Sequence, residues 1–204
     1  MQDFRAHHGE CPSSEKACHV FAVYDMIAVM FEELDSLLQG LQGREFAFAA
    51  GAPIFHLGDA VRLVHFVRRG AIHLVRYQDD GAALILQRAG AGSILAEASV
   101  YSDRYHCGAR AESAAVTWAV AQKDLRHHLE ARPEFSQAWS RHLAHEVQRA
   151  RLHAEILSLK TVEARLSAWM TLNGVLPAKG QRRRVADEIG VSSEALYREI
   201  AKRV

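Results

Sequence analysis

The chain has 204 residues, of which 49% are hydrophobic and 24% charged, and its formal net charge is +1. This length is enough for one large domain or two small ones. Because the overall charge is nearly neutral, a nucleic-acid partner would need a local basic surface. The most apolar window near the start, residues 20–38, contains four acidic residues, which excludes a secretory signal and a membrane span.

The three cysteines, Cys11, Cys18 and Cys107, make an odd number. Together with the lack of a signal sequence they favour free thiols in a reducing cytoplasm. Cys11 and Cys18 lie near His8 in a short polar N-terminal segment, and soft nitrogen and sulfur ligands at such spacings can bind a transition metal. The segment has no paired C-x-x-C, so an incidental clustering of these residues is the alternative.

Residues 1–43 are expected to form a tail followed by an amphipathic helix over 20–41, which ends at Gly40 and Gly43. The pattern then changes to short apolar runs separated by glycine, proline and aspartate. Strands are predicted at 46–49, 61–67, 72–77, 83–87 and 115–120. Many short strands at this spacing indicate an antiparallel barrel or roll, and a helix is expected over 124–131.

Residues 133–160 contain a single proline, at their start, and no glycine. Their apolar positions recur at steps of four and three, as in the seam of a two-stranded coiled coil. These positions are Leu143, Val147, Ala150, Ala154 and Leu157. The pattern predicts one long helix that pairs with a copy of itself, and the alternative is a core helix of a monomeric domain.

A further amphipathic helix is expected over 162–172, and the last segment, 181–204, has the spacing of a helix-turn-helix. The first helix would end at Gly190, and Ser192 would cap the second. The buried positions are predicted to be Val185, Ala186, Ile189, Val191, Ala195, Leu196 and Ile200.

The exposed face of the second helix is a candidate DNA-reading surface. Ser193 and Glu194 lie at its N-terminal end and Arg198 lies one turn further on. A carboxylate can accept from a cytosine amino group, and arginine can pair with guanine through two hydrogen bonds. Phosphate contacts are expected from Arg182, Arg183, Arg184, Lys202 and Arg203, and Ser192 is a further expected DNA-binding residue. The alternative is a solvated charged face on a small helical domain.

Taken together, these segments resemble the Crp/Fnr family of bacterial transcription regulators over nearly the whole chain. The matching residues are Gly58-Asp59, Phe66-Val67 followed by Gly70, the stretch 92–111, and Gly190-Val191-Ser192-Ser193-Glu194 with Arg198. The resemblance implies an α+β protein with a cyclic-nucleotide-binding-like β-roll at 44–131, a dimerisation helix at 132–160 and a helix-turn-helix domain at 161–204. It further implies a cytoplasmic homodimer on twofold-symmetric duplex DNA, with RNA polymerase as a further candidate partner and no membrane.

The chain departs from the family in the effector pocket. Glu97 matches the glutamate that holds the ribose in cyclic-nucleotide binders, but Tyr105, followed by His106, stands where the phosphate arginine is expected. A buried phosphate without a cation is poorly compensated, so cyclic AMP is not the expected effector. Family members also continue into a two-stranded wing, whereas this sequence ends at Val204, which leaves the tightness of DNA binding open.

A different effector is expected to bind in the altered pocket, which is formed by Glu97, Tyr105, His106 and Cys107. One branch of the family senses carbon monoxide through haem held by cysteine and histidine, and another uses an iron–sulfur cluster that needs four cysteines. Haem or a soft metal such as copper, held by Cys107 with the N-terminal Cys11, Cys18 or His8, is one hypothesis. The alternative is that Cys107 is a small buried apolar residue.

No enzyme is expected. The sequence contains no nucleophile elbow, P-loop, dinucleotide fingerprint or H-E-x-x-H motif. The remaining alternative to a DNA-binding regulator is a dimeric ligand-binding module that acts on a protein partner.

Overall fold

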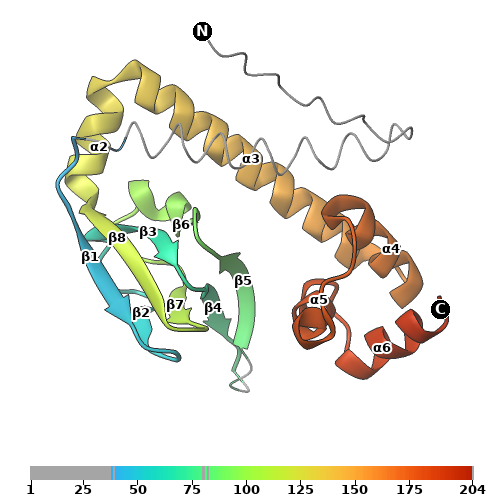
Figure 1. Ribbon diagram of the computed structural model, residues 1–204. Coiled ribbons are helices and arrows are strands. Elements are labelled where there is room, and N and C mark those ends of the chain that lie inside the picture. Colours follow the sequence, from blue (N-terminus) through green and yellow to red (C-terminus); the bar gives the residue numbers. More distant parts are fainter. Residues whose placement is uncertain (1–37, 39, 80, 82, 204) are drawn as a thin grey trace, which may run out of the picture. The chain divides into compact units, whose positions relative to one another are not determined.

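The computed structural model describes residues 38, 40–79, 81 and 83–203 (Figure 1). Contacts divide this part of the chain into two compact units, one that ends at Leu143 and one that begins at Ala144. The first unit contains the strands β1 (Gly43–Phe48), β2 (Pro53–Phe55), β3 (Leu63–Arg69), β4 (Ile72–Tyr77), β5 (Ala83–Ala89), β6 (Ile94–Leu95), β7 (Gly108–Ala111) and β8 (Ala115–Ala121).

The strands form two four-stranded antiparallel sheets. One has the order β1-β8-β3-β6 and the other β2-β7-β4-β5, so each sheet joins strands that are distant in sequence. The predicted antiparallel roll is confirmed, and the five predicted strands correspond to β1, β3, β4, β5 and β8. The sequence did not predict β2, β6 and β7, which are only two to four residues long. β2 begins with proline and β7 contains glycine and arginine, whereas β6 consists of two apolar residues.

The interior of the roll contains Phe55, Val67, Ile72, Leu95 and Cys107, all buried. Its turns depend on glycine where the chain folds back tightly. Between β3 and β4, Gly70 has φ +83°, and a Cβ there would overlap the backbone of Ala114.

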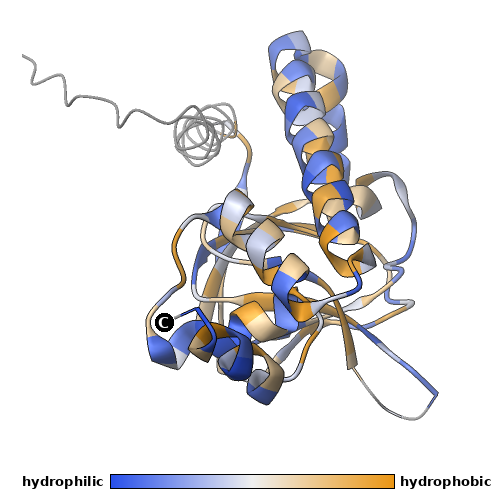
Figure 2. Ribbon diagram, turned by 90° about the vertical axis from the view of Figure 1, so that its right-hand side faces the viewer, coloured by the Kyte–Doolittle hydropathy of each residue, from blue (hydrophilic) through white to orange (hydrophobic). Residues whose placement is uncertain are grey.

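Helices follow the last strand of the roll. They are α2 (Gln122–Ala131) and α3 (Pro133–Ser158). Earlier in the chain, a 3₁₀ turn, η1 (Glu97–Tyr101), lies between β6 and β7. The first turns of α3 bury Phe135, Ala138 and Trp139 against the roll. The helix predicted over 133–160 therefore exists, and Figure 2 shows both hydrophobic and hydrophilic residues along it.

The second unit consists of the end of α3 with α4 (Val162–Asn173), a 3₁₀ turn η2 (Lys179–Gln181), α5 (Arg182–Glu188) and α6 (Ser193–Ala201). Thr161 caps α4, because its side chain accepts a hydrogen bond from the backbone N–H of Ala164. The core of this unit is formed by Ile156, Leu166, Trp169, Val185, Ala186, Ile189 and Leu196.

Most of the helix predicted over 20–41 lies outside the described residues. No helix in the described part of the chain is long and apolar enough to cross a membrane.

Candidate nucleic-acid interface and effector site

The connection between α5 and α6 is made by a glycine and a capping serine. α5 ends at Glu188, and Gly190 follows with φ +64°, a conformation that residues with a side chain adopt poorly. Ser192 accepts a hydrogen bond through Oγ from the backbone N–H of Ala195 at 3.2 Å. The predicted glycine stop and serine cap are therefore confirmed.

Two side chains from neighbouring helices hold this connection. Arg165, on α4, donates from Nη1 to the carbonyl oxygens of Ile189 at 3.1 Å and of Gly190 at 3.2 Å. His153, on α3, donates from Nε2 to the carbonyl oxygen of Glu188 at 2.7 Å. The last carbonyl groups of a helix have no partner within it, and these two side chains satisfy three successive ones.

The carboxylate of Glu188 adds a second attachment. Trp169, on α4, donates from Nε1 to Glu188 Oε2 at 2.7 Å, and Arg184 pairs with Oε1 at 2.7 Å. α5 is thus fixed through one residue to both α3 and α4. The position of α6, which follows after four residues, depends on this attachment.

The face of α6 predicted to read bases is accessible. Glu194 and Arg198 are exposed, and Ser193 is half-buried. The pKa of the Glu194 carboxyl is lowered by hydrogen bonds from its own backbone N–H and from the Ser192 side chain, and by the charge of Arg198. The helix therefore presents an ionised acceptor and a cationic donor one turn apart.

The basic residues predicted to touch phosphate are not equally available. Arg182 donates from Nε to the carbonyl oxygen of Pro177 at 3.3 Å, and Arg184 pairs with Glu188 as described. Arg203 donates from Nη2 to the carbonyl oxygen of Glu163 and to Ser167 Oγ, both at 2.9 Å. Arg183 is exposed and makes no hydrogen bond or ion pair with the other described residues.

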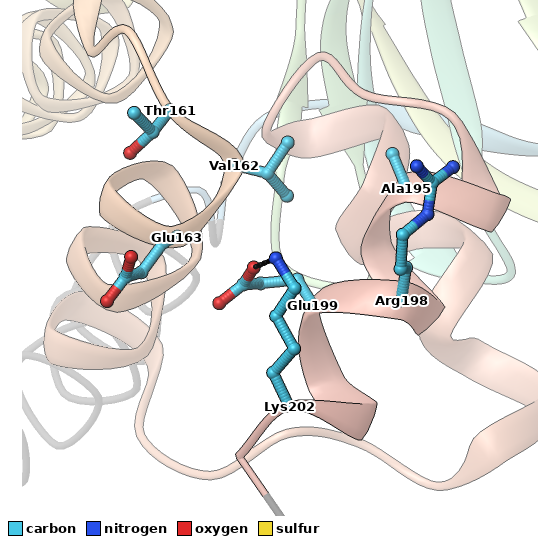
Figure 3. Close-up of a pocket in the computed structure, with 7 residues that line it drawn as sticks. All are labelled: Thr161, Val162, Glu163, Ala195, Arg198, Glu199 and Lys202. Atoms are coloured by element: carbon cyan, nitrogen blue, oxygen red, sulfur yellow. Dashed lines mark hydrogen bonds and ion pairs between the residues drawn. The ribbon is translucent and has the colours of Figure 1, made fainter.

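A pocket of about 340 Å³ lies between the start of α4 and α6 (Figure 3). Its lining residues are Thr161, Val162, Glu163, Ala195, Arg198, Glu199 and Lys202. Glu199 is buried, and its carboxylate lies 3.4 Å from Lys202 Nζ and 3.4 Å from Arg203 Nε. Through these ion pairs, Lys202 and Arg203, two of the predicted phosphate contacts, are bound to a residue of α6. Arg198 also lines the pocket, and its side chain is exposed.

The apolar positions predicted for the dimer seam are largely uncovered in the single chain. Val147 is 48% exposed and Leu157 39% exposed, and Ala150 and Ala154 are exposed as well. Leu143 differs, because it is half-buried and packs against the core of the roll.

Tyr105, which stands in place of the phosphate arginine, belongs to the interior of the roll. Its ring stacks on Phe55 with centroids 3.7 Å apart, and its hydroxyl donates to the carbonyl oxygen of Leu63 at 2.6 Å. Burial, with smaller effects of Asp59 and Cys107, raises the pKa of Tyr105 to about 12. The tyrosine is therefore neutral and supplies no cation for a phosphate.

His106 and Cys107 differ in burial, but both lie in a bend before β7 and not in the strand from which alternation was expected. His106 is exposed and its Nδ1 lies 3.2 Å from Ser99 Oγ, whereas Cys107 is fully buried. The pKa of the Cys107 thiol is raised by burial, while Arg76 acts to lower it and Glu97 to raise it. Burial fits the interpretation of Cys107 as a small apolar residue.

The remaining predicted pocket residue, Glu97, is half-buried. Its Oε2 lies 3.3 Å from Gln87 Nε2, which also lies 3.3 Å from the carbonyl oxygen of Ile94. Arg76 donates from Nη2 to the carbonyl oxygen of His106 at 2.9 Å. The structure thus adds Arg76 and Gln87 to the residues around this site.

Three predicted metal ligands, His8, Cys11 and Cys18, lie outside the described residues. Among the residues that are described, no three histidine, cysteine, aspartate or glutamate side chains form a group that could hold a metal ion.

Sequence reasoning missed Arg76, Gln87, His153 and Arg165. Each acts through a partner at least seven residues away, to which no local spacing points. For Arg76 the available signal was a charged side chain in a predicted strand whose other residues are mostly apolar.

One part of the chain is similar to a known protein family. Residues 45–132 match the family model of the cyclic nucleotide-binding domain. No curated protein sequence matches the chain.

Solved structures match over more of the chain. FixK2 from Bradyrhizobium japonicum is 19% identical with a TM-score of 0.65, over 79% of this chain and 84% of that protein. The global regulator CLP from Xanthomonas campestris is 18% identical with a TM-score of 0.61, over 86% and 90%. A CRP-family transcriptional regulator from Thermus thermophilus is 18% identical with a TM-score of 0.57, over 77% and 83%. Residues 45–132 therefore resemble a cyclic nucleotide-binding domain, and the chain has the fold of these three regulators.

Proposed function

We propose that the chain is a homodimeric DNA-binding transcription regulator whose β-roll receives an effector other than cyclic AMP. The α5–α6 pair carries this proposal. It combines a turn at Gly190, a capped second helix and an exposed face with Glu194 and Arg198. These features support a helix-turn-helix, a motif whose second helix enters the major groove.

Base reading is assigned to the first turns of α6. Ionised Glu194 is suited to accept from a cytosine amino group, and Arg198 to pair with guanine. Arg183, exposed and without a protein partner among the described residues, is the leading phosphate contact. Lys202 is also exposed and pairs with Glu199 only at 3.4 Å, so a DNA phosphate can compete for it.

Dimerisation is assigned to α3. The exposed side chains of Val147, Ala150, Ala154 and Leu157 leave an apolar stripe that a second copy of the helix would bury. A twofold dimer presents two copies of α6, so the expected partner is duplex DNA with a twofold-symmetric site. RNA polymerase is the further protein partner that this role implies.

Cyclic AMP is not proposed as the effector. The position of the missing phosphate arginine is occupied by neutral Tyr105, which is committed to Phe55 and to the carbonyl group of Leu63. Of the similar proteins, CLP is a c-di-GMP responsive regulator. That relationship supports an anionic effector in general, without naming one for this chain.

The experiment begins with selection of bound sequences from a pool of random duplexes. Affinity for a selected site and for an unrelated duplex is then measured over a range of salt concentrations. Arg198→Ala should lose about 1–3 kcal/mol of binding to the selected site and relax its specificity. Arg183→Ala should weaken both duplexes equally and reduce the salt slope by about one.

Arg62→Ala is the matched control, because Arg62 is exposed on the β-roll and its replacement removes the same charge. Its binding should equal that of the wild type. A folded wild-type protein that binds neither duplex at low salt contradicts the proposal and favours the dimeric module that acts on a protein partner.

A further inference from the structure

We propose that the pocket between the start of α4 and α6 binds a small ω-amino carboxylate, a molecule with an ammonium group and a carboxylate at the two ends of an aliphatic chain. The pocket lies within the second unit, and binding there does not depend on the proposed function. Its effect on DNA does depend on that function, because Arg198 lines the pocket and is also the residue assigned to guanine. The ligand would therefore compete with DNA for one side chain.

The size and the walls of the pocket limit the ligand. A volume of about 340 Å³ is near the lower end of the range found for small-molecule sites. One wall is the start of α4, with Thr161, Val162 and Glu163, and the other is α6 with Lys202 directly after it. A small ligand would thus be held between two helices and not on one exposed helix face.

One charged group of the lining already has its partners. Glu199 is buried, and its Oε2 lies 3.4 Å from Lys202 Nζ. Its Oε1 lies 3.4 Å from Arg203 Nε, so the carboxylate is bound between two cations. A buried carboxylate that is paired in this way does not need a cation from a ligand.

The two other charged residues of the lining have opposite signs. Arg198, on α6, and Glu163, on α4, are both exposed. Within the described part of the chain neither side chain makes a hydrogen bond or an ion pair, and Arg198 acts on Glu194 only through its charge. In Figure 3 they lie on opposite sides of the Glu199–Lys202 pair. The pocket therefore offers one partner for an anion and, apart from it, one partner for a cation.

These two side chains determine the polar groups of the ligand. A guanidinium binds a carboxylate through two parallel hydrogen bonds, which suits Arg198. An ammonium group carries three donors for the carboxylate of Glu163. Glu163 would repel a ligand that is only an anion, and Arg198 would repel one that is only a cation. The expected ligand therefore carries both charges.

The apolar part of the lining determines what joins the two charges. Val162 and Ala195 are half-buried lining residues, one on each wall. In Figure 3 the side chain of Val162 lies between those of Glu163 and Arg198. Methylene groups between the two charged ends of a ligand would cover this apolar surface. A molecule whose two charges are on neighbouring atoms would leave it exposed.

The test uses the full-length protein and isothermal titration calorimetry. The probe is 6-aminohexanoate, and its counterparts are hexanoate, pentylamine and glycine, which lack the ammonium group, the carboxylate and the longer aliphatic chain. The wild type should bind 6-aminohexanoate with one site per chain and each counterpart at least about tenfold more weakly. Equal affinity for any counterpart would show that the group it lacks is not recognised, which overturns this class of ligand.

Variants locate the binding site. Glu163→Gln and Arg198→Gln should each weaken 6-aminohexanoate about tenfold. Glu163→Gln should bind hexanoate at least as tightly as the wild type, because it removes a repulsion, and this readout excludes a general loss of structure. Glu130→Gln and Arg62→Gln are matched controls, since they remove the same charges from exposed positions of the first unit. Unchanged affinity of both pocket variants, or no binding by the wild type at millimolar concentration, overturns the site.

The effect on DNA is measured separately. At ten times its dissociation constant, 6-aminohexanoate should weaken wild-type binding to a selected duplex about tenfold. At the same concentration it should weaken Glu163→Gln only about twofold, because that variant binds the probe less tightly. If the probe binds but leaves duplex affinity unchanged, the shared role of Arg198 is overturned. A protein that binds the probe through both residues but binds no duplex keeps the ligand site and loses the proposed function.

Discussion

His153 Nε2 lies 2.7 Å from the carbonyl oxygen of Glu188, so the helix proposed to form the dimer donates a hydrogen bond to the end of α5. This bond links the two proposed activities of the chain, pairing through α3 and DNA reading through α6. A change in the direction of α3 would move the acceptor carbonyl and with it the start of the α5–α6 connection.

His153→Ala should lower the free energy of unfolding of the C-terminal unit by about 1 kcal/mol, because the Glu188 carbonyl loses its side-chain donor. We expect affinity for a selected duplex to fall about threefold to tenfold. Urea denaturation and fluorescence anisotropy measure the two effects. Gln148→Ala, an exposed residue of the same helix, is the control, and His153→Gln should restore part of the loss. Identical results for His153→Ala and Gln148→Ala would refute the link.

Gly190→Ala should destabilise the same unit by about 1–2 kcal/mol, because an alanine at φ +64° is strained. Its Cβ would also lie 2.9 Å from Leu157 Cδ2 and 3.4 Å from Arg165 Nη1, so the methyl group would push against α3 and α4. Gly180→Ala is the matched control, since no atom lies within 4 Å of a Cβ there. Comparable urea midpoints for the two variants would contradict the packing described for Gly190.

Val147→Glu should raise the dimer dissociation constant at least tenfold, because it places two carboxylates in the seam of a symmetric pair. Gln148→Glu introduces the same charge at the neighbouring exposed position and should have little effect. Sedimentation equilibrium measures both constants. Equal association of the two variants, or a monomeric wild type, would count against pairing through α3.

His65 should make the β-roll sensitive to mild acid. Burial lowers the pKa of its imidazole from 6.5 to about 4, and Nδ1 lies 3.0 Å from Thr117 Oγ1 in the core. A depressed pKa means that the unfolded chain takes up the proton first. The stabilisation is complete above pH 6.5 and is lost as the pH falls toward 4, by about 2 kcal/mol at pH 5.

Urea unfolding at several pH values measures this loss. His65→Gln keeps a hydrogen-bonding group but cannot titrate, so its stability should fall less steeply between pH 6.5 and 4 than that of the wild type. The exposed His127→Gln should follow the wild-type curve. Parallel curves for wild type and His65→Gln would show that this imidazole does not control acid stability.

The features that the sequence predicted well are local. Gly190 and Ser192 define a helix end and a cap within a few residues, and the α3 pattern repeats over several turns, so short-range rules suffice. β2, β6 and β7 were missed because strands of two to four residues show no alternation and exist only through pairing with distant strands.

The candidate sites could be predicted only in part. Residue type and position indicated Arg182, Arg184 and Arg203 as phosphate contacts, but their bonds to Pro177, Glu188 and Glu163 depend on tertiary packing. Arg76 was not predicted as a site residue, although the structure places it beside the site. Its strand was predicted, and its proximity to His106 follows from the pairing of β4 with β7, which local spacing does not specify.

The strand order of the roll also sets an order of folding. β4 and β5 form a hairpin of neighbouring strands, whereas β1 pairs with β8, so that Gly43 meets Val120. A nascent chain can form the hairpin with Arg76 and Leu84 as soon as it is synthesised, because short loops close quickly. The β1-β8-β3-β6 sheet has to wait for residue 121. The β4–β5 hairpin can therefore form early, whereas the sheet that completes the roll forms last.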